Sequence, residues 1–323
     1  MSSTTEKPEE FQNMKTNQIR VALLGGNGFL GHNVQLELGA AGIAYSVFSR
    51  KTGCDLLNLQ NARQEIKAFR PTHIVNCAAH VGSVKFVSDY AADVVDQNMR
   101  ILLNIYAIAQ ENADVVLINP IANCGYPGTL DHYVETEFWS GPIHSSVLSY
   151  GSTRRMIDVL SECYYAQYKI LSANVIVPNM YGPFDSTDPM KTHALNALVI
   201  KFLRATESGS NEVEIWGTGR PVREWLFVKD CARVICLLLQ SDQDVSSPVN
   251  IAQNHGWSVD EIAQAISSKV GYKGRIVKNL SFPDGSPKKI MDDRLFKDRF
   301  PDFEFTSFES GLDATVAYYR SVL

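Results

Sequence analysis

A glycine-rich turn near the start of the chain constrains the fold more than any other stretch of the sequence. The apolar run from Val21 to Leu24 predicts a buried strand, and Gly25, Gly28 and Gly31 follow it at three-residue spacing, before a predicted helix over residues 31–39. Glycines let the backbone turn tightly and approach a pyrophosphate, which the free N–H groups at a helix start bind. The stretch therefore predicts a dinucleotide site, although a tight turn without a ligand has the same glycines.

Length, charge and cysteine pattern restrict the class of protein. The 323 residues suffice for one large α/β domain or for two lobes that share a core. The net charge of −5 argues against nucleic acid as a partner, and no apolar run approaches the ~20 residues that cross a membrane. The six cysteines show neither Cys-x-x-Cys pairs nor zinc spacing, so we expect no metal site and a reduced, cytoplasmic setting. Residues 1–17 are polar and are expected to form a flexible leader.

Strand and helix patterns alternate through the first half of the chain. Beyond the first strand, short apolar runs predict strands at residues 44–48, 72–79, 114–119 and 173–177. Sequence patterns between these strands predict helices at residues 61–69, 89–112 and 150–169. Such alternation is typical of a Rossmann-type, doubly wound parallel sheet in the α/β class.

The second half of the chain has a less regular pattern. We expect a loop at residues 178–189, and then helices near 192–206, 229–240 and 258–270 with short strands at 213–216 and 249–251. Ser258 and Glu261 have the spacing of a capping box. The domains expected are an NAD(P)-binding Rossmann domain over 18–178 and a smaller, mainly substrate-binding lobe over 179–323, with segments near 226–253 returning to the first domain.

The end of the second predicted strand bears on the choice of cofactor. NAD sites often have an acidic residue here that binds the ribose 2′-hydroxyl, but this chain has Ser49, Arg50 and Lys51. The two cations suit a 2′-phosphate, so NADP is favoured and NAD remains possible; two solvated surface charges are the alternative. The other residues expected at the cofactor are Asp55 and Leu56, Phe29 and Leu30 of the glycine turn, and the small Ala78 and Ala79 at a strand end.

Tyr150 and Arg154 are candidates for proton transfer. They lie one turn apart at the start of a predicted helix and therefore project from the same face. A cation stabilises a phenolate and lowers the pKa of the tyrosine, which makes it a usable proton donor near neutral pH. The spacing alone is common by chance, and its position after the fifth strand of a dinucleotide fold is what favours the catalytic interpretation.

Several motifs together resemble one protein family. From about Arg20 to Asp292 the chain is similar to the extended short-chain dehydrogenase/reductases of the NAD-dependent epimerase/dehydratase family that act on nucleotide sugars. The motifs that carry the resemblance are Gly25-Gly26-Asn27-Gly28-Phe29-Leu30-Gly31, Asn123-Cys124-Gly125-Tyr126-Pro127, Tyr150-Gly151-Ser152-Thr153-Arg154, Asn179-Met180-Tyr181-Gly182-Pro183, Asp188-Pro189 to His193, and Trp216-Gly217-Thr218-Gly219 to Arg223-Glu224-Trp225.

The resemblance implies an NADP-dependent epimerase and reductase of a nucleotide-linked sugar, of the GDP-4-keto-6-deoxyhexose type. Tyr150 would donate the proton when hydride reduces C4, and Arg154 stands where the family has a lysine that holds the nicotinamide ribose. Ala122 replaces the family's serine, so the amide of Asn123 would take over its hydrogen bond. Two alternatives stay open: an epimerase that oxidises its substrate transiently without net reduction, and a non-catalytic dinucleotide-binding protein.

The same resemblance assigns epimerisation and substrate binding. Cys124 would be the base and His193 the acid that invert centres next to the ketone, and both side chains are expected to titrate near neutral pH. The nucleotide diphosphate sugar would be bound by Asn179, Lys201, Trp216, Arg223 and Lys289. In the family, the helices that correspond to residues 92–112 and 151–168 pair between subunits, so a homodimer is expected.

Overall fold

The computed structural model describes residues 18–112, 114–240, 247–282, 284 and 286–323. The leader expected at residues 1–17 lies outside the described residues. Within these ranges, no helix has the length and apolar character needed to cross a bilayer.

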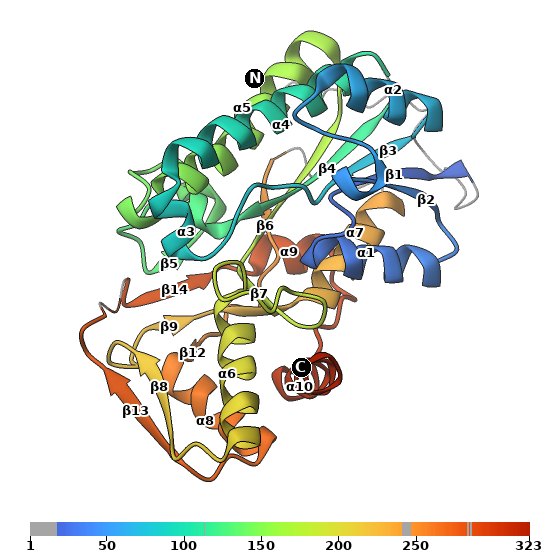
Figure 1. Cartoon of the computed structure of the whole chain (residues 1–323). Helices are drawn as coiled ribbons and strands as arrows, with labels where there is room; N and C mark the ends of the chain where they lie inside the picture. Colours follow the sequence, from blue (N-terminus) through green and yellow to red (C-terminus); the bar gives the residue numbers. More distant parts are fainter. Residues whose placement is uncertain (1–17, 113, 241–246, 283, 285) are drawn as a thin grey trace.

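The larger part of the molecule is built around a six-stranded parallel sheet (Figure 1). Its spatial order is β11-β6-β4-β3-β1-β2. The strands are β1 (Arg20–Leu24), β2 (Ala44–Phe48), β3 (His73–Asn76), β4 (Val116–Ala122), β6 (Ser172–Val177) and β11 (Val249–Asn250). β3 and β6 are buried along their whole length because helices cover both faces of the sheet.

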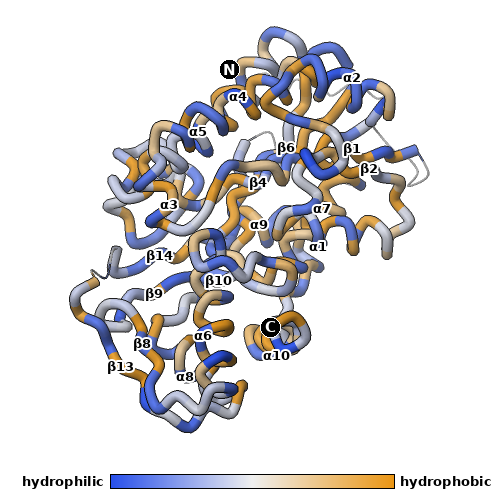
Figure 2. Tube along the Cα trace, viewed as in Figure 1, coloured by the Kyte–Doolittle hydropathy of each residue, from blue (hydrophilic) through white to orange (hydrophobic). Residues whose placement is uncertain are grey.

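The helices pack in two layers on the sheet. Leu30, Val34 and Leu38 of α1 share one apolar cluster with α7, whereas Ile66 of α2 belongs to the cluster on the other face. The helices of this part are α1 (Phe29–Ala40), α2 (Leu59–Phe69), α3 (Val84–Asp89), α4 (Ala91–Gln110), α5 (Leu148–Tyr168), α7 (Val228–Gln240) and α9 (Arg294–Arg299). The expected doubly wound α/β fold is therefore confirmed, and hydrophobic stretches run along its central strands (Figure 2).

The strand order reverses between β1 and β3. From β1 the chain passes to β2 on one side and then returns to β3 on the other, so a crevice forms beyond the carboxyl ends of β1 and β3. Ligands of open parallel sheets bind at such a reversal. The glycine turn follows β1 directly, and Cys77 and Ala78 follow β3.

A smaller lobe packs beside this crevice (Figure 1). A third apolar cluster fills it, with residues of all three of its helices. Its helices are α6 (Ala194–Ser208), α8 (Val259–Val270) and α10 (Phe308–Val322). Its strands are β7 (Asn179–Tyr181), β8 (Glu212–Trp216), β9 (Val222–Arg223), β10 (Trp225–Phe227), β12 (Trp257–Ser258), β13 (Arg275–Asn279) and β14 (Lys288–Met291). Ser258 and Glu261 form the capping box that starts α8.

Glu224 joins distant segments at the junction of the two parts. Its carboxylate accepts hydrogen bonds from the backbone N–H of Gln253 at 2.6 Å and of Met291 at 2.8 Å. β14 in turn pairs with both β9 and β5 (His132–Tyr133), and β5 comes from the first half of the chain. Burial raises the pKa of Glu224 to about 7, against the opposing effect of these backbone N–H groups.

The elements that were predicted differ from the observed ones at their ends, whereas α3, α9, α10 and most of the short strands of the smaller lobe were not predicted. α1 begins at Phe29 rather than Gly31, and Tyr150 is the third residue of α5 rather than its first. The loop expected at 178–189 was wrong in part, because Asn179–Tyr181 forms β7. Its partner β10 lies more than 40 residues further along, so the pairing leaves no local signal.

Candidate active site

The glycine turn lies against the end of β3. Gly25 has a φ of +70°, and a Cβ there would lie 2.8 Å from the backbone of Ala78. A Cβ on Gly31 would lie 2.3 Å from the carbonyl oxygen of Gly25, so helix and turn touch through their backbones. Gly28 precedes α1 as its N-cap and has no side chain to bond the first N–H groups. These donors therefore remain for an anion.

A cleft of about 260 Å³ opens beside this turn. Nine of the residues expected at the cofactor line it: Gly25, Gly28, Ser49, Arg50, Lys51, Asp55, Leu56, Ala78 and Ala79. The other expected residues of the turn, Phe29, Leu30 and Gly31, lie in the first turn of α1. Arg50 and Lys51 are exposed in a short 3-10 turn that Ser49 and Thr52 cap, so both cations stand at the mouth of the cleft.

Tyr150 and Arg154 lie together on α5. The guanidinium carbon of Arg154 lies 4.8 Å from the centre of the Tyr150 ring, a cation–π contact. Arg154 donates to Asn98 Oδ1 at 3.1 Å, yet its Nε has no partner among the described residues, although the residue is only 3% exposed. Burial raises the pKa of Tyr150, and the charge of Arg154 opposes that rise. The two side chains therefore lie on one face of α5, as their four-residue spacing predicts.

Asn123 and Cys124 form a 3-10 turn directly after β4. A Cβ on Gly151 would lie 2.5 Å from the carbonyl oxygen of Cys124, so only a glycine lets the first turn of α5 approach this closely. The Cys124 turn and the Tyr150 helix are thereby brought into contact. The Nδ2 of Asn123 is buried and has no hydrogen-bond partner in the part of the chain that the structure describes, which leaves an amide donor free beside Cys124.

The protonation of Cys124 differs from the expectation. Burial raises the pKa of its thiol to about 11, and Lys289 and Arg154 oppose this rise only in part. The prediction that Cys124 titrates near neutral pH is therefore wrong for the ligand-free site, because the sequence pattern shows the cysteine but not how deeply the turn is buried.

Lys289 and Arg223 lie side by side. They are directly paired residues of the parallel strands β14 and β9. Burial lowers the pKa of both side chains, and for Lys289 the neighbouring Arg223 lowers it further. Two adjacent, partly buried cations repel each other and are stabilised by an anion between them. This pair therefore has the charge required for a diphosphate.

His193 lies at the N-terminus of α6, where Asp185 holds it. Asp185 Oδ2 accepts hydrogen bonds from the backbone N of His193 at 2.8 Å and from its Nδ1 at 3.1 Å. The His193 ring lies 5.0 Å from the ring of Phe29, the first residue of α1. This contact brings the histidine beside the helix that follows the glycine turn.

The remaining predicted substrate residues lie in the smaller lobe. Asn179 donates its amide to the carbonyl oxygen of Glu224, and Lys201 of α6 donates to that of Glu214. Trp216 is 61% exposed and stacks on Phe282 with 4.3 Å between ring centres. One face of the indole is therefore covered by Phe282.

The family follows from comparison with known proteins. Residues 21–252 match the model of the NAD dependent epimerase/dehydratase family. The chain belongs to this family. The expected family and enzyme class are thereby confirmed.

Relatives within the family cover nearly the whole chain. The GDP-L-fucose synthase of Escherichia coli (strain K12) is 30% identical, over 93% of this chain and 96% of the relative. The GDP-L-fucose synthase of Dictyostelium discoideum is 26% identical, over 94% and 96%. A crystal structure of a GDP-L-fucose synthetase from Naegleria fowleri has a TM-score of 0.85 at 25% identity and covers 94% of both chains. Its NADP-bound form has a TM-score of 0.86 at 24% identity over 96% and 95%, which shows the same fold.

Sequence reasoning missed three polar residues at this family site. Asn98 of α4 bonds Arg154 and both backbone groups of His80, and Asp185 bonds His193. Glu224 has no predicted role and is named in the sequence motifs only within Arg223-Glu224-Trp225. Asn98 and Glu224 act through contacts between segments far apart in the chain, and Asp185 bonds a residue eight positions further along, so none of the three has a periodic signal in the sequence.

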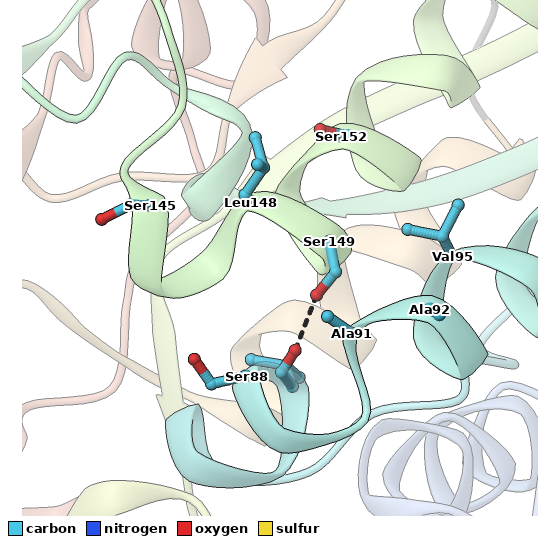
Figure 3. Close-up of a pocket in the computed structure, with 9 residues that line it drawn as sticks. Ser88, Ala91, Ala92, Val95, Ser145, Leu148, Ser149 and Ser152 are labelled. Atoms are coloured by element: carbon cyan, nitrogen blue, oxygen red, sulfur yellow. Dashed lines mark hydrogen bonds between the residues drawn. The ribbon is translucent and has the colours of Figure 1, made fainter.

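A second hollow, of about 370 Å³, lies between α3, α4 and the start of α5 (Figure 3). Ser149 Oγ donates across it to the carbonyl oxygen of Val87 at 2.7 Å. Small apolar and hydroxyl side chains line it, and within the described residues none of them titrates near neutral pH. This hollow therefore lacks the acid–base groups of the site described above.

Proposed function

We propose that the protein is an NADP-dependent epimerase and reductase of a nucleotide-activated 4-keto sugar, of the GDP-4-keto-6-deoxyhexose type. The observation that carries this proposal is the contact through Gly151, which joins the Tyr150 helix to the Cys124 turn. One site thereby contains Tyr150, a candidate for protonating the oxygen of the carbonyl that is reduced, and Cys124, a candidate for exchanging protons at carbon. The GDP-L-fucose synthases among the relatives support the GDP sugar.

The cofactor proposal rests on the crevice between β1 and β3. The glycines let the turn pack tightly on Ala78 and on its own backbone, which leaves the N–H groups at the start of α1 for a pyrophosphate. Arg50 and Lys51 at the cleft mouth suit a 2′-phosphate, so NADP is preferred over NAD. When bound, the nicotinamide cofactor supplies the hydride. The unpaired Nε of Arg154 is a buried donor that suits a ribose hydroxyl. The unpaired Nε of Arg154 is thus a feature of the protein that fits the ribose of the nicotinamide cofactor.

Reduction at C4 requires a proton on the ketone oxygen. Tyr150 holds that proton on its phenol, because burial keeps its pKa raised, and Arg154 stabilises the phenolate that remains after transfer. The free Nδ2–H of Asn123 binds the same oxygen in place of the serine hydroxyl that Ala122 lacks.

Epimerisation requires a base and an acid beside the ketone. Cys124 removes the proton from carbon as its thiolate, whose charge Lys289 and Arg154 stabilise in part, and His193 returns a proton. Arg223 and Lys289 bind the diphosphate, while Asn179, Lys201 and Trp216 bind the sugar and nucleotide. Each role is a proposal that mutation of the single residue tests.

A Tyr150→Phe variant is the first test. The phenol oxygen is lost while the ring that packs under Arg154 stays, so we expect reduction of a GDP-4-keto-6-deoxy sugar to slow about 10²–10⁴-fold. Proton exchange at the carbons next to the ketone should continue, as measured by NMR in D2O alongside NADPH consumption. Unchanged NADPH consumption would contradict the proposed mechanism.

Two alternatives stay open, and Ala122 and Arg154 favour the non-catalytic one, because they replace residues that the family uses for hydride transfer. A transiently oxidising epimerase would invert the sugar without net consumption of NADPH. A non-catalytic dinucleotide-binding protein would bind NADPH and leave every 4-keto sugar unchanged. Counting NADP⁺ released for each sugar converted separates the three proposals.

We also propose a homodimer in the cytoplasm. α4 and α5 expose apolar side chains to solvent: Val95 and Leu103 on α4, and Leu148, Tyr165 and Tyr168 on α5. Covering these side chains with the same surface of a second copy would remove them from water. Light scattering of the wild-type chain measures the mass, and a charge at Leu103 should shift it toward that of one chain.

A further inference from the structure

Asp185 is a buried carboxylate in the loop between β7 and α6. The residue is 7% exposed, and its two oxygens accept hydrogen bonds from four donors. Ser186 N bonds Oδ1 at 2.8 Å, and Oδ2 accepts from His193 N at 2.8 Å, His193 Nδ1 at 3.1 Å and Asn196 Nδ2 at 2.9 Å. A carboxylate with this many donors stays ionised in the interior.

The ionised state follows from the balance of two effects. Burial raises the pKa of Asp185, but the hydrogen bonds and charge of His193 and the amide of Asn196 outweigh it and hold the pKa below the ordinary value. An ionised carboxylate only accepts hydrogen bonds, so the Nδ1 atom of His193 must carry a proton. Nε2 is then the ring nitrogen left for other partners, and the side chain of His193 is 38% exposed.

We propose that Asp185 is a positioning residue that keeps the proton of His193 on Nδ1 and orients Nε2 for proton exchange with the substrate. This inference rests on the proposed function of the site, in which His193 returns the proton to carbon. The carboxylate does not itself touch the substrate.

The loop that carries Asp185 is fixed to the helix of the glycine turn. His32 of α1 stacks on Phe184 with 4.0 Å between ring centres, and Asn33 donates to the carbonyl oxygen of Pro183 at 3.1 Å. Phe184 has a φ of +71°, a backbone conformation that a bulky residue adopts only where its surroundings enforce it. The carboxylate is thus held on a rigid support beside α1, as a positioning role requires.

Few other charges act on this pair. Asp188 and Lys191 lie on the same loop and are mostly exposed. From α10, Tyr318 and Tyr319 face Asp185, and both phenols have a pKa above the ordinary value because of burial and of this carboxylate. Both tyrosines are therefore neutral between pH 5 and 9. Over that pH range, a change in the ring-proton position of His193 when the Asp185 charge is removed therefore reports on the Asp185–His193 pair itself.

The direct test is the protonation of His193, which needs no substrate. In long-range ¹H–¹⁵N spectra of the full chain, we expect neutral His193 to carry its proton on Nδ1. In Asp185→Asn, the amide can donate as well as accept a hydrogen bond, so neutral His193 should lose its preference for the Nδ1 proton. Asp188→Asn, which removes an exposed charge from the same loop, is the matched control. A proton on Nε2 in the wild type, or an Asp185→Asn variant with the same ring-proton position as the wild type, would overturn the proposal.

The activity test separates positioning from a general structural role. In Asp185→Asn we expect solvent exchange at the carbons beside the ketone to fall at least about tenfold. NADPH affinity and the rate of reduction of an already epimerised ketone should stay near those of the wild type. If solvent exchange, NADPH affinity and the rate of reduction all fell to the same extent, the positioning role would be overturned. A wild type with the Nδ1 proton but no exchange on any nucleotide 4-keto sugar would instead contradict the proposed function.

Discussion

Tyr150 and His193, the two proposed proton donors, are held in different ways. Tyr150 lies on a 21-residue helix, yet the polar groups around it are incompletely paired: Arg154 Nε and Asn123 Nδ2 have no partner within the described ranges. His193 lies at the end of a loop, yet Asp185 bonds both its backbone and its ring. The unpaired donors on the hydride-transfer side suit oxygen atoms that a ligand brings. The proton-exchange side is instead organised by the protein's own hydrogen bonds.

The difference matters because the two sides depart from the family pattern unequally. Ala122 and Arg154 replace expected residues on the hydride-transfer side, whereas Cys124 and His193 match the expected pair on the other. A buried donor without a partner costs roughly 1–3 kcal/mol, which a ligand oxygen recovers on binding. We therefore expect variants on the two sides to affect different steps.

Cys124→Ser should give the largest effect of the remaining variants. A serine hydroxyl ionises far less readily than a thiol, so solvent exchange beside the ketone should fall about 10²–10⁴-fold. Reduction of an already epimerised ketone should be little changed, the reverse of Tyr150→Phe. Cys163→Ser, at an exposed position of α5, is the control. If reduction falls as much as exchange, the two sides are not separate.

Asn123→Ala tests the hydride-transfer side with a smaller effect. Loss of the unpaired amide donor should slow reduction by about 10²-fold, as loss of a donor to a developing oxyanion does. Asn123→Ser offers a hydroxyl at this position and should recover part of the rate. Single-turnover oxidation of NADPH measures both variants. An alanine variant with the wild-type rate would mean that this amide does not bind the reacting oxygen.

Lys289→Met should have the smallest effect, which is a change in the pKa and reactivity of the Cys124 thiol. The ammonium opposes the rise in the pKa of Cys124 that burial causes, so its loss should raise that pKa above about 11. At pH 8–9 the thiolate fraction, and with it alkylation of Cys124 by iodoacetamide, should fall up to about tenfold. Peptide mass spectrometry follows Cys124 separately, and exposed Lys288→Met is the control. Faster alkylation would reverse the assigned role.

Much of the Rossmann part could be predicted because its signals are local. The glycine spacing, the apolar strand at residues 20–24 and the small residues after β3 each lie within a few positions of one another. β2 has the predicted bounds, since an apolar run and its turn fix both of its ends. Helix ends moved by two residues where the cap was a glycine, which has no side-chain signal.

The smaller lobe and the junction were harder to predict for a physical reason. β7 and β9 have three and two residues, too few for a periodic pattern, and β7 exists because β10 pairs with it. Glu224 and Asp185 are charged residues that the sequence would place at the surface, but backbone and side-chain donors from other segments stabilise both in the interior.

The sequence by itself determined the fold class, the family and the residue types available for proton transfer. These properties depend on local spacing and on motifs whose members are neighbours in the chain. Only the tertiary structure decided the electrostatics: the raised pKa of Cys124, the unpaired Nε of Arg154 and the carboxylate behind His193. Burial and long-range contacts set these properties, and both arise only once distant segments pack together.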